Sequence, residues 1–220
     1  MKKFLRNNWL YFILYLVVLI WAAYYLFQFD KVALHIKLNS LVGNPIIDLF
    51  FKYFTNVGDG IFAIIIGLIV LLFNIRKGIF ILATYIVSGL CTSFLKNFCF
   101  GDVNRPHFVF GYFVQKVKLN LVNGVDMVGL NSFPSGHATS AFALFTCLAL
   151  ITENKFTKII FFTIGLLAAF SRTYLSQHWL VDITVGSLIG TVFAVAFYFV
   201  FINSNKLEKL NKPLFNFKKS

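Results

Sequence analysis

The sequence predicts an all-α membrane protein, a single-domain bundle of six transmembrane helices. Of its 220 residues, 59% are hydrophobic and only 13% are charged, whereas about a quarter of the residues of a soluble domain are charged. The apolar residues are grouped in runs, several of them close to the roughly 20 residues that cross a bilayer as a helix. Basic residues collect where these runs end, as is typical of the charges that orient a membrane protein.

We expect six spans, and their lengths divide them into two groups. In chain order the expected ranges are 9–27, 60–74, 78–95, 136–151, 158–171 and 179–202. The first follows a basic segment and ends in bulky aromatic residues, which indicates an uncleaved helix rather than a signal peptide. The second, fourth and fifth fall short of the roughly 20 residues that a lipid-facing helix needs. They are expected either to be buried in the bundle or to extend by a turn.

Two connecting segments and one glycine pair carry further expectations. Segment 38–54 has apolar residues at helical spacing with charged residues between them, which predicts a short helix at the membrane interface. Segment 99–134 is the one long polar loop of the sequence, and long loops in compact proteins tend to be functional. Gly186 and Gly190 lie one turn apart in the last span, which indicates a close helix-packing face.

The distribution of charge predicts how the chain is oriented. The formal net charge is +12, but the basic residues flank the apolar runs, so we expect a lipid bilayer and no nucleic acid as partner. Twelve of the 20 Lys and Arg residues lie on one set of ends, in segments 1–8, 75–77, 152–158 and 203–220. The N- and C-termini are therefore expected in the cytoplasm and the long loop outside.

Three ionisable residues lie where the fifth span ends and the sixth begins. Such residues are costly at membrane depth, so they usually face a cavity or a pathway and have a function there. Arg172 closes the fifth span, and His178 and Asp182 open the sixth. Because Asp182 follows His178 by four residues, the two share one face of a helix. Asp182 could accept the Nδ1–H of His178 and leave Nε2 free to attack a substrate, as the orienting carboxylate does in a catalytic triad.

A second group of polar residues is expected at the same face of the membrane. Lys96 closes the third span, and Arg105 follows it in the long loop. Ser135, Gly136 and His137 open the fourth span. Because successive spans alternate in direction, this group and the first one both fall on the outer side. The sequence therefore predicts one site built from both.

The combined residues suit chemistry on a phosphoryl group. The site has three cations, and two of them are guanidinium groups able to contact phosphoryl oxygens through two hydrogen bonds. Two helices also begin there and direct free backbone N–H groups into it. Ser135 can cap its helix or bind the anion, and Gly136 allows the backbone to come close. With His178 as nucleophile, His137 is left as the general acid, since it has no acidic neighbour at helical spacing.

These motifs resemble those of the type 2 phosphatidic acid phosphatase superfamily, which shares its phosphate pocket with the vanadium haloperoxidases. The three motifs of that family are Lys-x6-Arg-Pro, Pro-Ser-Gly-His and Ser-Arg-x5-His-x3-Asp. Residues 134–137 match the second in full, and residues 171–182 match the third. The first departs, because eight residues rather than six separate Lys96 from Arg105. Either the loop holds a two-residue bulge or Lys96 is not the phosphate ligand. The resemblance spans roughly residues 60–202.

The resemblance implies a membrane enzyme that hydrolyses a phosphomonoester or diphosphate of a lipid. It implies a phosphohistidine on His178, a general acid at His137, an orienting Asp182, no metal and no cofactor. The implied phosphate ligands are Lys96, Arg105, Ser135, Gly136 and Arg172. The lipids that the family covers include phosphatidate, phosphatidylglycerophosphate, undecaprenyl pyrophosphate and lipid A phosphates, and we favour the last two.

Two other functions stay open at this point. A phosphotransferase of the same fold would pass the phosphoryl group to another lipid instead of water. A proton- or anion-coupled transporter belongs to a different class, since intramembrane His, Arg and Asp residues also mark transport pathways. Transporters tend to have inverted repeats and a site at the middle of the membrane, whereas the polar residues here are expected at one face. The oligomeric state is not predicted.

Overall fold

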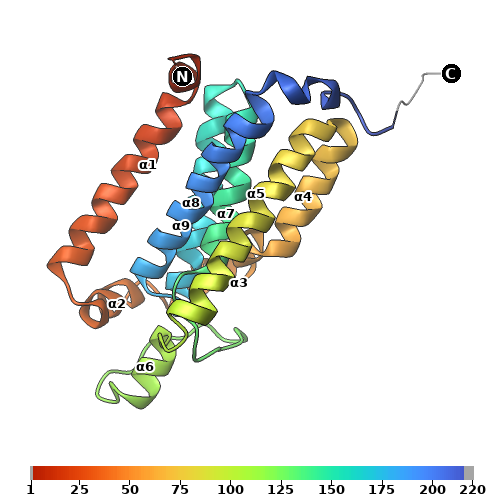
Figure 1. Ribbon diagram of the computed structural model, residues 1–220. Coiled ribbons are helices and arrows are strands. Elements are labelled where there is room, and N and C mark those ends of the chain that lie inside the picture. Colours follow the sequence, from red (N-terminus) through yellow and green to blue (C-terminus); the bar gives the residue numbers. More distant parts are fainter. Residues whose placement is uncertain (1, 216–220) are drawn as a thin grey trace.

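The computed structural model describes residues 2–215, and all regular elements within that range are helical (Figure 1). The helices are α1 (Lys2–Gln28), α2 (Lys31–Asn39), α3 (Pro45–Phe54), α4 (Gly60–Phe73), α5 (Ile75–Phe94), α6 (Pro106–Tyr112), α7 (Gly136–Ile151), α8 (Lys155–Tyr174) and α9 (Leu180–Phe197). Short 3₁₀ turns cover Thr55–Gly58 and Asn205–Leu210, and π-helical turns cover Leu95–Cys99 and Tyr198–Ile202. Lys218 and Lys219, part of the expected cytoplasmic tail, lie outside the described residues.

The chain is an integral membrane protein with an all-α fold. By length and composition, four helices in residues 2–215 can cross a membrane: α1, α8, α5 with its π-helical turn, and α9 with its own. A fifth span is possible where α3 and α4 join, although that pair is bent by 56°. The remaining expected span, α7, has 16 residues. The predicted count of six is therefore approximate.

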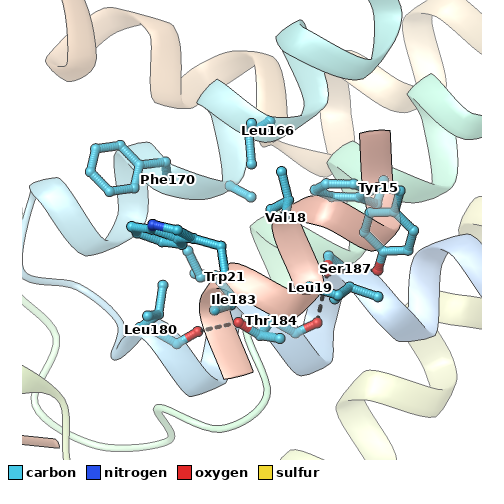
Figure 2. A pocket seen from close by; sticks show the side chains of 13 residues that line it. Tyr15, Val18, Leu19, Trp21, Leu166, Phe170, Leu180, Ile183, Thr184 and Ser187 are labelled. Carbon is cyan, nitrogen blue, oxygen red and sulfur yellow. Dashed lines mark hydrogen bonds between the residues drawn. The ribbon is translucent and has the colours of Figure 1, made fainter. Parts of the chain in front are cut away.

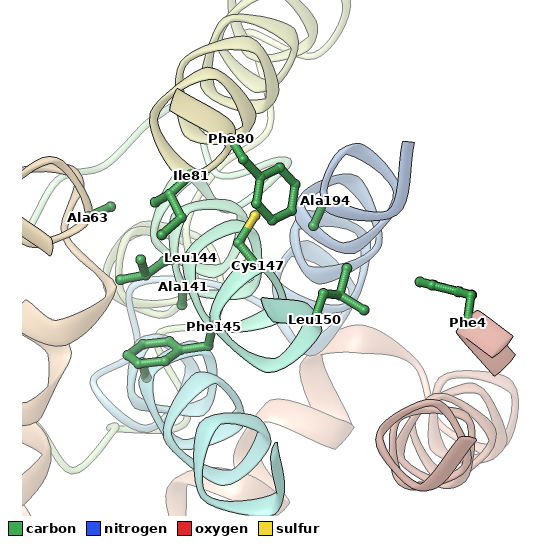
Figure 3. Close-up of a cluster of buried hydrophobic side chains, with 11 residues drawn as sticks. Phe4, Ala63, Phe80, Ile81, Ala141, Leu144, Phe145, Cys147, Leu150 and Ala194 are labelled. Carbon is green, nitrogen blue, oxygen red and sulfur yellow. The ribbon is translucent and has the colours of Figure 1, made fainter. Parts of the chain in front are cut away.

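The short helix α7 is the centre of the bundle. Twelve of its 16 residues are buried, and it packs against α5, α8 and α9. Figure 3 shows Leu144 and Cys147 of α7 facing Phe80 and Ile81 of α5, with Ala194 of α9 beside them. Since protein rather than lipid surrounds it, this helix has no need of the full bilayer length. The expected burial of the fourth span is confirmed.

The other short spans behave differently. Helix α8 extends beyond the expected range 158–171 at both ends and reaches 20 residues. Its earlier start follows from Asn154, which caps the helix by accepting from Phe156 N and Thr157 N. Helix α4 remains short, with 14 residues and an exposed outer face. Asp59 caps its start. The bend before α4 thus falls at this capping residue.

Helices α7 and α9 approach each other through the two predicted glycines. A Cβ atom added to Gly186 would lie 2.5 Å from Ser135 O, and one added to Gly190 would lie 2.5 Å from Thr139 O. Any larger residue would push the helices apart, so the expected packing face is confirmed. The contact also holds the start of α7 against the start of α9, where Ser135 N donates to Asp182 O at 3.1 Å.

The interfacial segment and the long loop contain more helix than expected. The predicted helix 38–54 begins only at Pro45, because Asn44 caps it and proline is favoured in the first turn. The residues before it form a separate helix, α2, which starts after the capping residue Asp30. Helix α6 lies in the long loop and likewise begins at a proline, Pro106. These short helices show no long apolar period, so the sequence pattern did not reveal α2 and α6.

The two ends of the bundle are formed by different segments of the chain. Helices α2 and α6 and the long loop lie at one end, opposite the start of α1 and the α4–α5 turn (Figure 1). At the second end the C-terminal segment is tied to the α4–α5 turn, where Ile75 N donates to Lys212 O and Leu214 N donates to Leu72 O, each at 3.0 Å. Which end faces the cytoplasm stays a prediction.

A small apolar cavity separates part of α1 from the rest of the bundle (Figure 2). It has a volume of about 60 Å³, and Leu166 and Phe170 of α8 and Ile183 of α9 face α1 across it. One polar contact closes its edge, the 2.9 Å hydrogen bond between the hydroxyl groups of Tyr15 and Ser187. The residues around this cavity hold α1 against the bundle, and they lie apart from the predicted site.

Candidate functional site

Most of the predicted site residues come from four helix ends at one end of the bundle, and Arg105 and His178 lie in loops beside them. Lys96 lies in the π-helical turn after α5, and Ser135–His137 begin α7. Arg172 lies in the last turn of α8, and Asp182 lies in the first turn of α9. All these helix ends lie near α2 and α6 in Figure 1. The clustering expected from alternating spans is thus found in the structure.

His178 and Asp182 form a buried pair. The Nδ1 atom of His178 lies 3.3 Å from Asp182 Oδ2, and both side chains are almost fully buried. The same oxygen accepts from the hydroxyl of Ser132 at 2.5 Å and from Trp179 N at 2.9 Å. Within residues 2–215, Asp182 Oδ1 has no hydrogen-bond partner. Sequence reasoning missed Ser132, which lies 50 residues from Asp182 and in no motif.

The pKa of His178 falls well below its ordinary value. Burial is the largest cause, because it disfavours the charged imidazolium, and the positive charges of Arg105, Arg172 and Lys96 act in the same direction. His178 is therefore neutral at physiological pH.

The loop that carries His178 is held from two sides. Gln177 N and His178 N both donate to Arg172 O, at 2.9 and 3.1 Å, and so tie the loop to the end of α8. Ser176 has a φ of 55°, which is unfavourable for a residue with a side chain. Its hydroxyl hydrogen-bonds with His35 Nε2 of α2 at 3.1 Å. The loop conformation thus depends on contacts made outside the loop.

His35 of α2 is a buried residue that supports this loop. The sequence places it between two lysines in a connecting segment, yet it is 1% exposed. Its ring packs edge-on against Trp179, with ring centroids 5.3 Å apart. Burial lowers its pKa to about 4. Only the tertiary fold brings α2 against the α8–α9 loop, so the sequence had no local signal for this contact.

Arg105 is positioned by the long loop and by Gln177. Its Nε atom donates to Leu130 O at 3.0 Å, and its Nη1 atom donates to Gln177 Oε1 at 2.9 Å. Gln177 is 1% exposed and donates in turn to Asp126 O at 2.9 Å. Burial lowers the pKa of Arg105, but a guanidinium group keeps its charge in proteins. Gln177 was not predicted, although it directly precedes His178.

Arg172 has spare hydrogen-bonding capacity. Its Nη1 atom donates to Thr55 Oγ1 at 2.9 Å. Its Nε atom is buried and finds no acceptor among the described residues. Buried donors are almost always paired in native proteins, so an unpaired one needs an explanation. A bound anion would supply the missing acceptor.

His137 lies beside a carboxylate that its own helix does not provide. Its Nε2 atom is 3.8 Å from Asp59 Oδ2, and the two side chains are 30% and 43% exposed. Asp59 also caps α4 through Ile61 N at 2.8 Å. The prediction that His137 lacks an acidic neighbour at helical spacing holds within its helix, but the cap of α4 provides one in space.

Ser135, Gly136 and Lys96 complete the arrangement. The hydroxyl of Ser135 accepts weakly from Ala138 N, at 3.4 Å, and so caps α7. A Cβ atom on Gly136 would meet no other atom of residues 2–215 within 4 Å, so space remains open at the helix start. Lys96, Gly136 and His137 line one cavity of about 260 Å³. Lys96 therefore lies at the site despite the unusual spacing before Arg105, and a π-helical turn accommodates it.

No set of three or more His, Cys, Asp or Glu side chains suited to a metal ion occurs within residues 2–215. The predicted independence from metals and cofactors stays a prediction, which chelation can test.

The family model described as PAP2 superfamily matches residues 77–206, more than half of the chain. The chain belongs to the PAP2 superfamily. The matched range contains every predicted site residue, whereas Thr55 and Asp59 precede it and are contributed by the first part of the chain. No curated protein matches the chain by sequence.

Two solved structures have a similar fold. The crystal structure of LpxE from Aquifex aeolicus is 24% identical, with a TM-score of 0.65, over 76% of this chain and 93% of that one. The first transmembrane PAP2 type phosphatidylglycerolphosphate phosphatase from Bacillus subtilis is 21% identical, with a TM-score of 0.62, over 96% and 99%. At these identities the likeness concerns the fold. The second match covers nearly the whole chain, so the helices before the family match belong to the shared fold as well.

Proposed function

We propose that this PAP2 superfamily chain is a membrane lipid phosphatase that works through a phosphohistidine on His178. The observation that carries the proposal is the buried pair of His178 and Asp182 next to Arg172, whose Nε atom lacks a partner among the described residues. A neutral imidazole with one nitrogen held by a carboxylate is prepared to attack with the other. The cations beside it suit the phosphoryl oxygens.

In the first step Nε2 of His178 attacks the phosphorus of the lipid phosphate. A nitrogen–phosphorus bond forms, the ester bond from phosphorus to the lipid oxygen breaks, and His137 gives that oxygen a proton. Asp182 accepts from Nδ1–H and stabilises the positive charge that develops on the ring. In the second step His137 takes a proton from water, the water oxygen attacks phosphorus, and phosphate leaves His178.

The phosphoryl oxygens are assigned to residues at the helix ends. Arg172 and Arg105 supply guanidinium donors, and Lys96 supplies an ammonium group. Gly136 supplies a backbone N–H group at the start of α7, where the helix dipole favours negative charge, and Ser135 supplies its hydroxyl group. Catalysis then comes largely from donors that are in place before charge develops on the phosphoryl group.

The substrate we propose is a phosphorylated lipid of the bacterial envelope. An undecaprenyl pyrophosphate or a lipid A phosphate is favoured, with phosphatidate and phosphatidylglycerophosphate as further members of the class. One of the two proteins with a similar fold is a phosphatidylglycerolphosphate phosphatase, which supports a lipid headgroup substrate. We place the protein in the inner membrane with its N- and C-termini in the cytoplasm and its site facing outward.

Phosphate release by the purified full-length protein in detergent tests the proposal. We expect release from at least one lipid of this class, and none from any of them would contradict it. His178→Ala should abolish turnover, and Asp182→Asn should lower the rate without abolishing it. Activity that survives EDTA supports a mechanism without metal, and full loss in EDTA would count against it.

Two added measurements separate the alternatives. With an alcohol or a second lipid in the assay, transfer to that acceptor in place of water would identify a phosphotransferase. A transporter would instead move phosphate across sealed vesicles without cleaving an ester. The gathering of polar residues at one end of the bundle, rather than at its middle, favours the enzyme over the transporter.

A further inference from the structure

The cavity beside His137 extends away from the phosphate-binding groups. Its volume of about 260 Å³ far exceeds the roughly 10–15 Å³ that holds one water molecule. Helices α4, α5 and α7 form its walls. The lining residues that matter here are Gly60, Tyr85, Gly89, Ser93, Lys96 and His137.

The α5 wall forms a continuous stripe that starts at the phosphate end. Tyr85, Gly89, Ser93 and Lys96 follow one another at intervals of three or four residues, so they lie on one face of α5. At 1.5 Å per residue the stripe is roughly 16 Å long. Lys96 lies at the end that faces the site, and Tyr85 begins deeper along the helix but places its hydroxyl against Gly60, the residue that follows Asp59. The cavity therefore leads from the predicted phosphate position along α5.

His137 determines which part of a substrate would occupy this cavity. A general acid must reach the oxygen that leaves phosphorus. Because His137 lines the cavity, the group bonded to that oxygen points into it. His178 must then lie on the opposite side of the phosphorus from the cavity, because the nucleophile attacks in line with the leaving oxygen.

Glycine keeps the cavity open, and hydroxyl groups make it polar. A Cβ atom on Gly89 would meet nothing within 4 Å among the described residues. In contrast, a Cβ atom on Gly60 would collide with Tyr85 Oη, so the phenol lies directly against the start of α4. Ser93 and Ser140 add further hydroxyl groups to the walls. The cavity beside α1 is lined mainly by apolar side chains.

We propose that this cavity is the subsite for the leaving group and that it selects lipids with hydrogen-bonding oxygens next to the scissile ester. Glycerol, sugar and phosphate leaving groups belong to this class, whereas a plain isoprenyl alcohol does not. Gly89 sets the room available, and the Tyr85 hydroxyl contacts a leaving-group oxygen. The proposal rests on the proposed function, since it presupposes that His137 protonates the leaving oxygen.

The test compares the full-length wild type with Gly89→Leu in the same detergent. For a glycerol-based lipid phosphate we expect kcat/KM of Gly89→Leu to fall at least tenfold, because the side chain fills the subsite. Inhibition by inorganic phosphate, which needs only the cationic end, should stay within about twofold. The matched control is Gly111→Leu in α6, another helical glycine whose Cβ would meet nothing within 4 Å among residues 2–215. It should behave as the wild type.

Two milder variants keep the test decisive if Gly89→Leu does not fold. Gly89→Ala should give a smaller fall of the same kind. Tyr85→Phe should reduce the preference for phosphatidate over farnesyl phosphate, which we expect to be at least tenfold in the wild type. An unchanged kcat/KM in Gly89→Leu, or equal use of the two lipids by the wild type, would overturn the subsite. A parallel loss of phosphate inhibition would also overturn it, because the phosphate position itself would then be disturbed. A wild type without phosphatase activity would instead overturn the proposed function.

Discussion

Helix α8 carries a basic residue near each end, and the two have different surroundings. Lys158 near its start is 1% exposed and donates to Asn8 Oδ1 at 2.5 Å and to Ala149 O at 2.8 Å. Asn8 in turn donates to Phe4 O at 2.9 Å. Arg172 near its end donates to Thr55, while its buried Nε atom has no acceptor in residues 2–215.

The difference indicates which end of the bundle has a function beyond folding. A buried cation whose donors reach protein acceptors stabilises the contact it makes, here between α1, α7 and α8. A buried donor without an acceptor destabilises the fold unless a ligand completes it. The unsatisfied donor of Arg172 therefore lies where the predicted substrate binds.

The largest effect that separates the two ends is expected from Arg172→Ala. Loss of the guanidinium group should lower kcat/KM by about a thousandfold, roughly 4 kcal/mol at about 1.36 kcal/mol per tenfold. Thermal unfolding should change little, because the side chain makes one hydrogen bond to protein. Lipid phosphate hydrolysis and a melting curve in the same detergent measure both. Arg6→Ala, an exposed arginine in α1, is the control, and equal losses of activity in the two variants would contradict the assignment.

The opposite pattern is expected from Lys158→Met. Asn8 Oδ1 and Ala149 O would lose their donor, which should lower the free energy of unfolding by about 1–3 kcal/mol. Activity per folded molecule should stay close to that of the wild type, since the residue lies at the other end of α8. Denaturant unfolding and specific activity measure the two quantities. Lys155→Met, an exposed lysine on the same helix, should change neither, and an undiminished stability of Lys158→Met would remove the contrast between the ends.

The pH profile offers a finer comparison within the site. His178 must be neutral to attack, and its depressed pKa extends activity to pH values well below 6.5. Removing a nearby positive charge by Arg105→Gln should raise that pKa and move the acid limb of kcat/KM to higher pH. Arg105→Lys keeps the charge and should keep the limb in place while lowering the rate. A limb that moves equally in both variants would exclude the electrostatic cause.

The smallest effect concerns His35 and the stability of the fold. Its folded pKa of about 4 lies below the unfolded value near 6.5, so the unfolded state binds more protons between these two pH values. The stability that the neutral ring contributes is complete above about pH 6.5 and is lost as the pH falls toward 4. In His35→Gln this acid loss should be reduced, as measured by unfolding at about pH 7.5 and about pH 5. The same pH dependence in both proteins would show that other groups cause it.

Much of the fold follows from local patterns in the sequence. Helix α7 occupies the predicted range 136–151, because Ser135 caps its start. The glycine pair on α9 marks a real helix contact. Helix α2 is different, since its short sequence has no long apolar period and its burial depends on the α8–α9 loop. The family motifs likewise indicated the main site residues, because their spacing along each helix is local.

The positioning residues could not be found in this way. Ser132, Gln177 and Asp59 touch Asp182, Arg105 and His137 through contacts between segments far apart in the chain. Ser, Gln and Asp in loops are also common as turn residues and helix caps, so residue type alone does not single them out. Lys158 was expected only as the start of a span. Its buried hydrogen bonds depend on where α1 packs.

Trapping the phosphoenzyme tests the central claim most directly. A lipid substrate labelled in its terminal phosphate is mixed with the full-length protein, the reaction is quenched in base, and the labelled peptide is identified. We expect a base-stable, acid-labile label on His178, which should be missing in His178→Ala. A label on another residue, or turnover by His178→Ala, would contradict the account.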